Sequence, residues 1–145
     1  RCGRCHACLD ACPTSSIISN QSSFISSRCL SYLTIEHRGP IPHSSLDSHS
    51  SFFILHSSFK NIYGCDICQL ACPWNRFAVP ATEPAFQPSE ALLTMTKEKW
   101  HNLTEEQYRI LFKGSAVKRA KYAGLMRNIN CFSSTEKGSL HDRIL

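Results

Sequence analysis

Eight of the nine cysteines follow a spacing that suits iron–sulfur chemistry. The first run reads C-x2-C-x2-C-x3-C and is followed by proline; its members are Cys2, Cys5, Cys8 and Cys12. The second run reads C-x2-C-x3-C, also before proline, and contains Cys65, Cys68 and Cys72. Cys29 stands between the runs. This pattern is typical of a chain that binds two four-iron, four-sulfur clusters, and it therefore predicts single-electron transfer.

The spacing also predicts which cysteines share a cluster. Cysteines at two-residue gaps wrap one side of a cubane, and the cysteine before proline ligates the other cluster. Cluster 1 is then expected to take Cys2, Cys5, Cys8 and Cys72. Cluster 2 is expected to take Cys12, Cys65 and Cys68, with Cys29 as the fourth ligand. Cys131 lies far from both runs, and we interpret it as a plain thiol.

Disulfides and zinc are the two alternative uses of these cysteines. Small secreted scaffolds do not usually combine two-residue gaps with Cys-Pro ends, so disulfides fit poorly. Zinc sites use C-x2-C pairs, but zinc gives no reason for a third cysteine at Cys8 or for the two prolines. The iron–sulfur interpretation explains both features.

Length and charge set bounds on the rest of the chain. The 145 residues leave room for one domain and part of another. The first 80 residues or so have few long apolar runs, and in such a segment bound metal often replaces a core. The formal charge of +5 counts cysteines as neutral. Two oxidised clusters would add about −4, so net charge says little about attraction to nucleic acid.

The sequence contains no stretch of roughly 18 apolar residues and no visible signal peptide, so we expect no membrane span. Iron–sulfur ligands suit a reducing compartment, which predicts a cytoplasmic location. Because the chain starts at Arg1, one residue before the first ligand, we expect that it is part of a larger protein.

We predict an α+β fold in which residues 1–79 form a ferredoxin-like domain for two [4Fe–4S] clusters. A helical turn is expected around Ala7–Ala11 and a brief strand at Ser15–Ile18. Arg28–Glu36 suits either a strand or a ligand-bearing helix. Residues 43–59 carry three His-Ser-Ser triplets and are interpreted as an inserted low-complexity loop, with a histidine metal array as the alternative.

Residues 80–88 are proline-rich and indicate a linker, and residues 89–130 indicate a short, repeat-like α-helical segment. Three helices are expected there: Glu90–Met95 capped by Ser89, one that starts with a capping box at 104–107 and stops at Gly114, and Ala116–Asn128 capped by Ser115. Residues 131–145 are interpreted as a disordered tail.

Four strings together resemble the epoxyqueuosine reductase family, over about residues 1–42 and 60–130. They are CGRCHACLDACPT, RCLSYLTIE, YGCDICQLACPWN and FKGSAVKRAKYAGLMRN. The resemblance implies a cytoplasmic, cobalamin-dependent oxidoreductase that reduces epoxyqueuosine in tRNA to queuosine. It implies the cluster ligands given above, a monomer and a cytosolic electron donor. A cobalamin domain with the catalytic acid would precede this segment, so no catalytic residue is expected here.

The resemblance also implies contacts outside the clusters. Leu30, Asp66 and Ile67 would lie against cobalamin; alternatively, Leu30 and Ile67 only shield the cluster and Asp66 caps a turn. Positions that could contact the tRNA backbone are His37, Arg38, Lys118, Arg119, Lys121 and Arg127. The alternative for the basic run is a solvated helix face.

The predicted function is therefore the iron–sulfur electron-transfer portion of an epoxyqueuosine reductase-like enzyme. A stand-alone dicluster ferredoxin is one alternative, because the cysteine runs alone are shared by many ferredoxins. Another cobalamin oxidoreductase, such as a reductive dehalogenase, and a non-functional fragment are the others.

Overall fold

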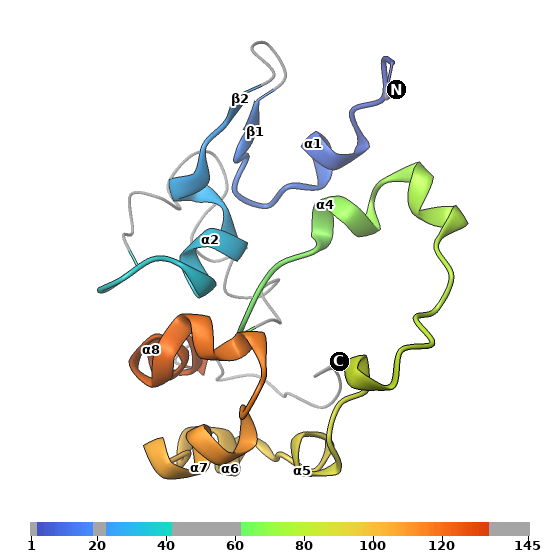
Figure 1. The fold of residues 1–145 in the computed structure, drawn as a ribbon. Helices are drawn as coiled ribbons and strands as arrows, with labels where there is room; N and C mark the ends of the chain where they lie inside the picture. Colours follow the sequence, from blue (N-terminus) through green and yellow to red (C-terminus); the bar gives the residue numbers. More distant parts are fainter. Residues whose placement is uncertain (1–2, 19–22, 42–61, 134–145) are drawn as a thin grey trace.

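The computed structural model describes residues 3–18, 23–41 and 62–133, and the 43–59 loop and the end of the tail lie outside these ranges. The described part is rich in helix and contains a small two-stranded sheet (Figure 1). Its cysteine-bearing half consists of α1 (Ala7–Ala11), β1 (Ile17–Ile18), β2 (Ser23–Phe24), η2 (Ser26–Arg28), α2 (Leu30–Ile35), α4 (Ile67–Leu70) and η4 (Pro73–Phe77).

The sheet is antiparallel, with Ile17 opposite Phe24 and Ile18 opposite Ser23. The predicted strand was too long at its start, because Ser15 has φ +47° and belongs to a turn. A non-glycine residue rarely adopts this left-handed conformation. The predicted helix at Ala7–Ala11 is confirmed with the same bounds.

Residues around the fourth predicted ligand form a helix, which resolves the choice left open by the sequence. Cys29 occupies the N-cap position of α2, and the buried side chains of this helix are Leu30, Leu33 and Thr34. Positions separated by three and four residues lie on one face of an α-helix, so this burial pattern requires helical rather than extended backbone.

The second half contains four α-helices and two 3₁₀ turns. They are η5 (Pro84–Phe86), α5 (Glu90–Leu93), α6 (Lys97–His101), α7 (Glu105–Leu111), η6 (Ala116–Ala120) and α8 (Lys121–Ser133). The predicted capping box at α7 is confirmed: the Thr104 side chain accepts from the Gln107 amide and the Gln107 side chain from the Thr104 amide. The caps at Ser89 and Ser115 are also present.

Three boundaries in this half differ from prediction. Helix α5 ends at Leu93, and a separate helix, α6, follows with Thr96 as its cap. The expected helix from 116 to 128 is divided, because Lys121 has φ +62° and separates η6 from α8. Helix α8 then continues to Ser133, beyond the expected end at Asn128, so residues 131–133, which were interpreted as the start of a disordered tail, are helical.

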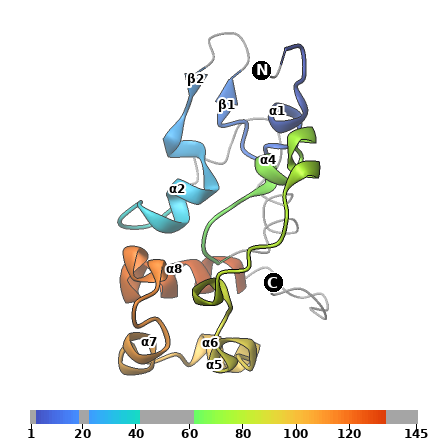
Figure 2. The ribbon, with the colours of Figure 1, turned by 45° about the vertical axis from the view of Figure 1, so that its right-hand side comes forward.

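Most of the apolar core lies in the helical half. Its buried members are Trp100, Leu103, Tyr108, Phe112, Leu125 and Ile129. The cysteine-bearing half has a much smaller buried cluster, Leu30 and Leu33, against which Ile41 and Cys65 pack. Helix α8 joins the halves, since it contacts both α2 and α6 (Figure 2). None of the helices in the described ranges is both long and apolar enough to span a bilayer.

Candidate iron–sulfur site

The two cysteine runs lie side by side because α1 packs against α4 (Figures 1 and 2). Cys8 lies within α1 and Cys12 directly follows it. In the same way, Cys68 lies within α4 and Cys72 follows one residue after the helix. Each run therefore turns through a short helix before its Cys-Pro end.

The Cys65 thiol interacts electrostatically with the three other thiols of the predicted cluster 2. Burial is the largest cause that raises the pKa of the Cys65 thiol, against a hydrogen bond from the Ile67 amide that lowers it. Neighbouring thiolates raise the pKa further, and they are those of Cys29, Cys68 and Cys12. Three separate segments thus bring the thiols of Cys12, Cys29 and Cys68 within electrostatic reach of Cys65. Such a group fits a cluster whose irons neutralise thiolates.

The predicted cluster 1 is described only in part, because Cys2 lies outside the described ranges. Cys5 is exposed, Cys8 and Cys72 are half-buried, and all three are free thiols, as are the other cysteines in the described ranges. Within these ranges, no three His, Cys, Asp or Glu side chains meet closely enough to hold one metal ion. The ligand sets of cluster 1 and cluster 2 both stay predictions.

Two hydroxyl side chains that the sequence analysis missed surround the sulfur of Cys12. Ser16 Oγ lies 3.1 Å and Thr14 Oγ1 3.8 Å from Cys12 Sγ, and the Ser16 amide donates to the same sulfur at 3.4 Å. Burial alone would raise the pKa of the Cys12 thiol, but hydrogen bonds from the side chains and backbone of Ser16 and Thr14 outweigh it, and the pKa is lowered. The sequence signal for these contacts was a pair of hydroxyl residues two and four positions after a predicted ligand.

A buried threonine connects the segments that carry Cys29 and Cys65. Thr34 Oγ1 donates to the Leu30 carbonyl at 2.7 Å, and the Gly64 amide donates to Thr34 Oγ1 at 3.0 Å. Since Gly64 directly precedes Cys65, this hydroxyl fixes the second run relative to α2.

Asn128 of α8 strengthens the same connection from the other side. Its Nδ2 donates to the carbonyls of Thr34 at 2.8 Å and Ile62 at 2.9 Å, and the residue is fully buried. Both acceptors lie near predicted cluster ligands in the sequence. A polar residue within the apolar stripe of Leu125 and Ile129 was the signal that could have revealed it.

Arg127 uses its guanidinium within the chain. Nη1 donates to the carbonyls of His37 and Gly39, Nη2 to the carbonyl of Leu33 and to Asn128 Oδ1, and Nε also to Asn128 Oδ1. A guanidinium has five N–H donors, and these five bonds account for all of them. Arg127 is thus a positioning residue for the backbone that follows α2, and we leave it out of the proposed RNA surface.

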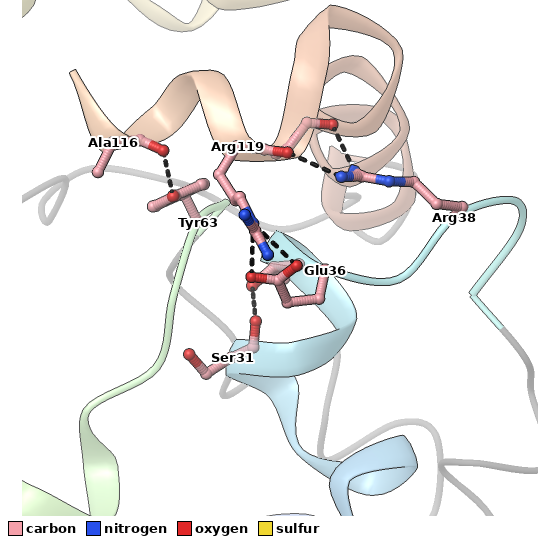
Figure 3. A network of polar contacts seen from close by, with 8 residues as sticks. Ser31, Glu36, Arg38, Tyr63, Ala116 and Arg119 are labelled. Atoms are coloured by element: carbon pink, nitrogen blue, oxygen red, sulfur yellow. Dashed lines mark hydrogen bonds and ion pairs between the residues drawn. The ribbon is translucent and has the colours of Figure 1, made fainter. Parts of the chain in front are cut away.

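Two further basic residues that were expected to contact RNA connect the region of α2 to η6 (Figure 3). Arg38 donates to the carbonyls of Ala120 at 3.1 Å and Arg119 at 2.9 Å. Arg119 Nε pairs with both Glu36 carboxylate oxygens, at 2.9 and 3.0 Å. Tyr63 completes this junction by donating to the Ala116 carbonyl at 2.7 Å. Arg38 and Arg119 nevertheless remain largely exposed.

The other predicted contact residues differ in exposure. His37 is half-buried and its Nε2 donates to the Pro40 carbonyl at 2.9 Å, whereas Lys118 and Lys121 are exposed. Leu30 is only 5% exposed and packs in the small core. Ile67 is half-buried, and Asp66 is exposed and accepts from Gln69 Nε2.

The family can now be stated from comparison with known proteins. A family model described as a 4Fe-4S double cluster binding domain matches residues 1–75, which include all eight predicted ligands. The chain belongs to the 4Fe-4S double cluster binding domain family. Membership supports iron–sulfur clusters as the cofactors of this double cluster domain.

Relatives of known name extend the similarity beyond the double cluster domain. An epoxyqueuosine reductase from Cellulophaga algicola is 44% identical over 130 residues, which cover 89% of this chain and 39% of that protein. The structure of epoxyqueuosine reductase from Streptococcus thermophilus is similar with a TM-score of 0.67 and 30% identity, over 90% of this chain and 31% of that one. The chain therefore spans between about three and four tenths of the length of these relatives.

A third similar structure is an epoxyqueuosine reductase crystallised with an epoxyqueuosine-modified tRNA-Tyr stem loop. It has a TM-score of 0.72 and 24% identity, over 91% of this chain and 32% of that one. At this identity the likeness shows a shared fold, which extends through both the double cluster domain and the helical half.

Proposed function

We propose that this chain is the iron–sulfur electron-transfer part of an epoxyqueuosine reductase-like enzyme. The observation that carries the proposal is the match of residues 1–75 to a 4Fe-4S double cluster binding domain. The electrostatic interaction of the Cys65 thiol with those of Cys12, Cys29 and Cys68 supports it. Similarity to epoxyqueuosine reductases over about nine tenths of the chain supports the assignment to that class of enzyme.

A four-iron cluster supplies the ability to take up and release one electron at a time. The protein's part is to hold thiolates at fixed positions and to limit the access of water. Cys29 would complete cluster 2 from the start of α2, and Leu30 and Leu33 would shield that side. Cys2, Cys5, Cys8 and Cys72 would hold cluster 1.

Cobalamin would accept electrons at the surface beside Asp66 and Ile67. Both residues lie between the predicted ligands Cys65 and Cys68, and Asp66 is exposed. An acceptor at this surface would be adjacent to cluster 2, and short distances favour electron transfer. Because Leu30 is buried, we propose that it shields the cluster rather than contacts cobalamin.

The substrate would be tRNA carrying epoxyqueuosine, as in the similar structure that contains a modified stem loop. Lys118 and Lys121 present exposed ammonium groups on η6 and at the start of α8, with Arg119 between them. His37 and Arg38 follow α2 and lie at the junction with η6 and α8. Charges in this arrangement would position a phosphate backbone without reading bases.

Metal analysis tests the proposal directly. We expect anaerobic reconstitution of the full chain to give about eight irons and eight sulfides per chain, because two cubanes contain four of each. Iron and acid-labile sulfide would be measured chemically, and the electron paramagnetic resonance (EPR) spectrum of the reduced protein would show two interacting clusters. Protein that is colourless and contains zinc or no metal would exclude this function.

The RNA surface is tested by reversing the two exposed lysine charges. We expect the double variant Lys118→Glu, Lys121→Glu to bind a queuosine-type tRNA anticodon stem loop about tenfold more weakly at low salt, because roughly two phosphate contacts are lost. Binding would be measured by fluorescence anisotropy over a series of salt concentrations, and the salt dependence should become shallower.

The control has the same change of net charge on α6, as Lys97→Glu with Lys99→Glu. It should keep both the affinity and the salt dependence of the unaltered chain. Equal losses in the two double variants would mean that only net charge matters, and the proposed surface would be incorrect.

A further inference from the structure

Thr14 and Ser16 form a buried hydroxyl pair beside the sulfur of a predicted cluster ligand. Thr14 is 5% and Ser16 2% exposed, and their hydroxyl oxygens lie 3.2 Å apart. A buried hydroxyl without a hydrogen-bond partner is costly, so such groups are placed where they are satisfied. Here the third member of the group is the sulfur of Cys12, at 3.1 Å from Ser16 Oγ.

The backbone is shaped to bring both hydroxyls to this sulfur. Ser15 adopts φ +47°, and the Ser15 amide donates to the Cys12 carbonyl at 3.2 Å, which closes a turn after the ligand. The Ile25 amide, directly after β2, donates to the Ser16 carbonyl at 2.8 Å and holds Ser16 from the other side. The left-handed residue between them lets Thr14 and Ser16 both reach Cys12 Sγ, and the Ser16 amide adds a third contact.

Ionisation of Cys12 sets the direction of these hydrogen bonds. A cluster ligand is a thiolate, which only accepts hydrogen bonds. Ser16 must then donate its hydroxyl proton to Cys12 Sγ. The Thr14 hydroxyl lies closer to Ser16 Oγ, at 3.2 Å, than to the sulfur, at 3.8 Å. Thr14 therefore donates to Ser16, and the two hydroxyls form a short chain that ends on the sulfur.

We propose that Ser16, supported by Thr14, raises the midpoint potential of cluster 2 through this hydrogen-bond chain to Cys12 Sγ. The inference rests on the proposed ligand set. Reduction adds one electron to the cluster, and the ligand sulfurs share the added negative charge. Donors directed at a sulfur stabilise the more negative, reduced state, and hydrogen bonds to sulfur are a known determinant of cluster potential. Ser16 and Thr14 are positioning residues in this account.

The test is the midpoint potential of each cluster in the full chain reconstituted without oxygen. Reduced signals would be followed by EPR while dithionite lowers the solution potential. We expect Ser16→Ala to lower the potential of cluster 2 and leave cluster 1 unchanged. At a fixed solution potential, the ratio of reduced to oxidised cluster 2 should fall about threefold to tenfold, where tenfold corresponds to about 59 mV for one electron.

Two further variants separate the hydrogen bond from packing. Ser16→Thr keeps the hydroxyl and should restore a potential close to that of the unaltered chain. Thr14→Val keeps the shape but removes the donor to Ser16, so it should lower the potential of cluster 2 by less than Ser16→Ala. Ser26→Ala, at an exposed position, should change neither potential.

Iron content distinguishes failure of this inference from failure of the proposed function. Fewer than eight irons in the unaltered chain would overturn the ligand set, and the inference with it. Eight irons with an unchanged cluster 2 potential in Ser16→Ala would overturn the inference alone, as would equal shifts of both clusters. If Ser16→Ala binds less iron than the unaltered chain, the test relies on Thr14→Val. A lowered cluster 2 potential in Thr14→Val would support the inference, and an unchanged potential would refute it.

Discussion

Replacement of Cys29 by alanine should halve the iron content, from about eight to about four irons per chain, because a cubane needs four thiolate ligands. Cys29 occupies the N-cap position of α2, and its thiol interacts electrostatically with that of Cys65. Without it, cluster 2 would have three ligands. Cluster 1 draws on no residue of α2 and should assemble normally. Iron and sulfide analysis with EPR of the reduced protein would measure this.

Two comparisons make the Cys29 result specific. Cys131→Ala alters the cysteine of α8 that belongs to neither run and should keep eight irons, within about one. Cys72→Ala should give the converse loss, with cluster 2 intact and cluster 1 missing. Two complete cubanes in Cys29→Ala would show that another group serves as the fourth ligand, and our ligand assignment would be wrong.

Replacement of Asn128 by leucine should lower the free energy of unfolding by about 2–4 kcal/mol, because removing one member of a buried polar network leaves its partners without hydrogen bonds. Leucine is similar in size but leaves the carbonyls of Thr34 and Ile62 without this donor. It also removes the Oδ1 acceptor of Arg127. Urea unfolding of the anaerobic protein, followed by fluorescence of Trp100 in the adjacent core, would measure the loss.

Asn130→Leu is the matched control, since Asn130 lies two residues further along α8 and is exposed. It should change stability by no more than about 0.5 kcal/mol. We also expect Asn128→Leu to reconstitute cluster 2 less completely than cluster 1, because the polar contacts of Asn128 connect the segments before Cys65 and after Cys29. A stability loss equal to that of the control would mean that the hydrogen bonds of Asn128 contribute little.

Local features were the ones that could be predicted from sequence. The helix at Ala7–Ala11, the capping box at Thr104 and the serine caps are confirmed because each depends on interactions within a few residues. The cluster ligands were proposed from spacing for the same reason. Ligands at fixed short gaps need a particular loop conformation, which leaves a pattern in the sequence.

Tertiary contacts determined the features that could not be predicted from the sequence. The segment after Cys29 is helical because one face of α2 is buried. Arg127 was predicted to contact RNA, yet backbone carbonyls about 90 positions away accept three of its five hydrogen bonds, and the adjacent Asn128 accepts the other two. Thr34 and Asn128 likewise gain their roles from chain segments distant in sequence.

The sequence by itself therefore predicted iron–sulfur chemistry, from eight cysteines spaced for two cubanes, and it determined the local caps. Only the tertiary structure decided which polar residues hold those cysteines in place and which surround the sulfur of Cys12. The physical reason is that ligand spacing is a short-range constraint written in neighbouring residues. Burial and hydrogen bonding of a side chain depend instead on whichever distant segment packs against it.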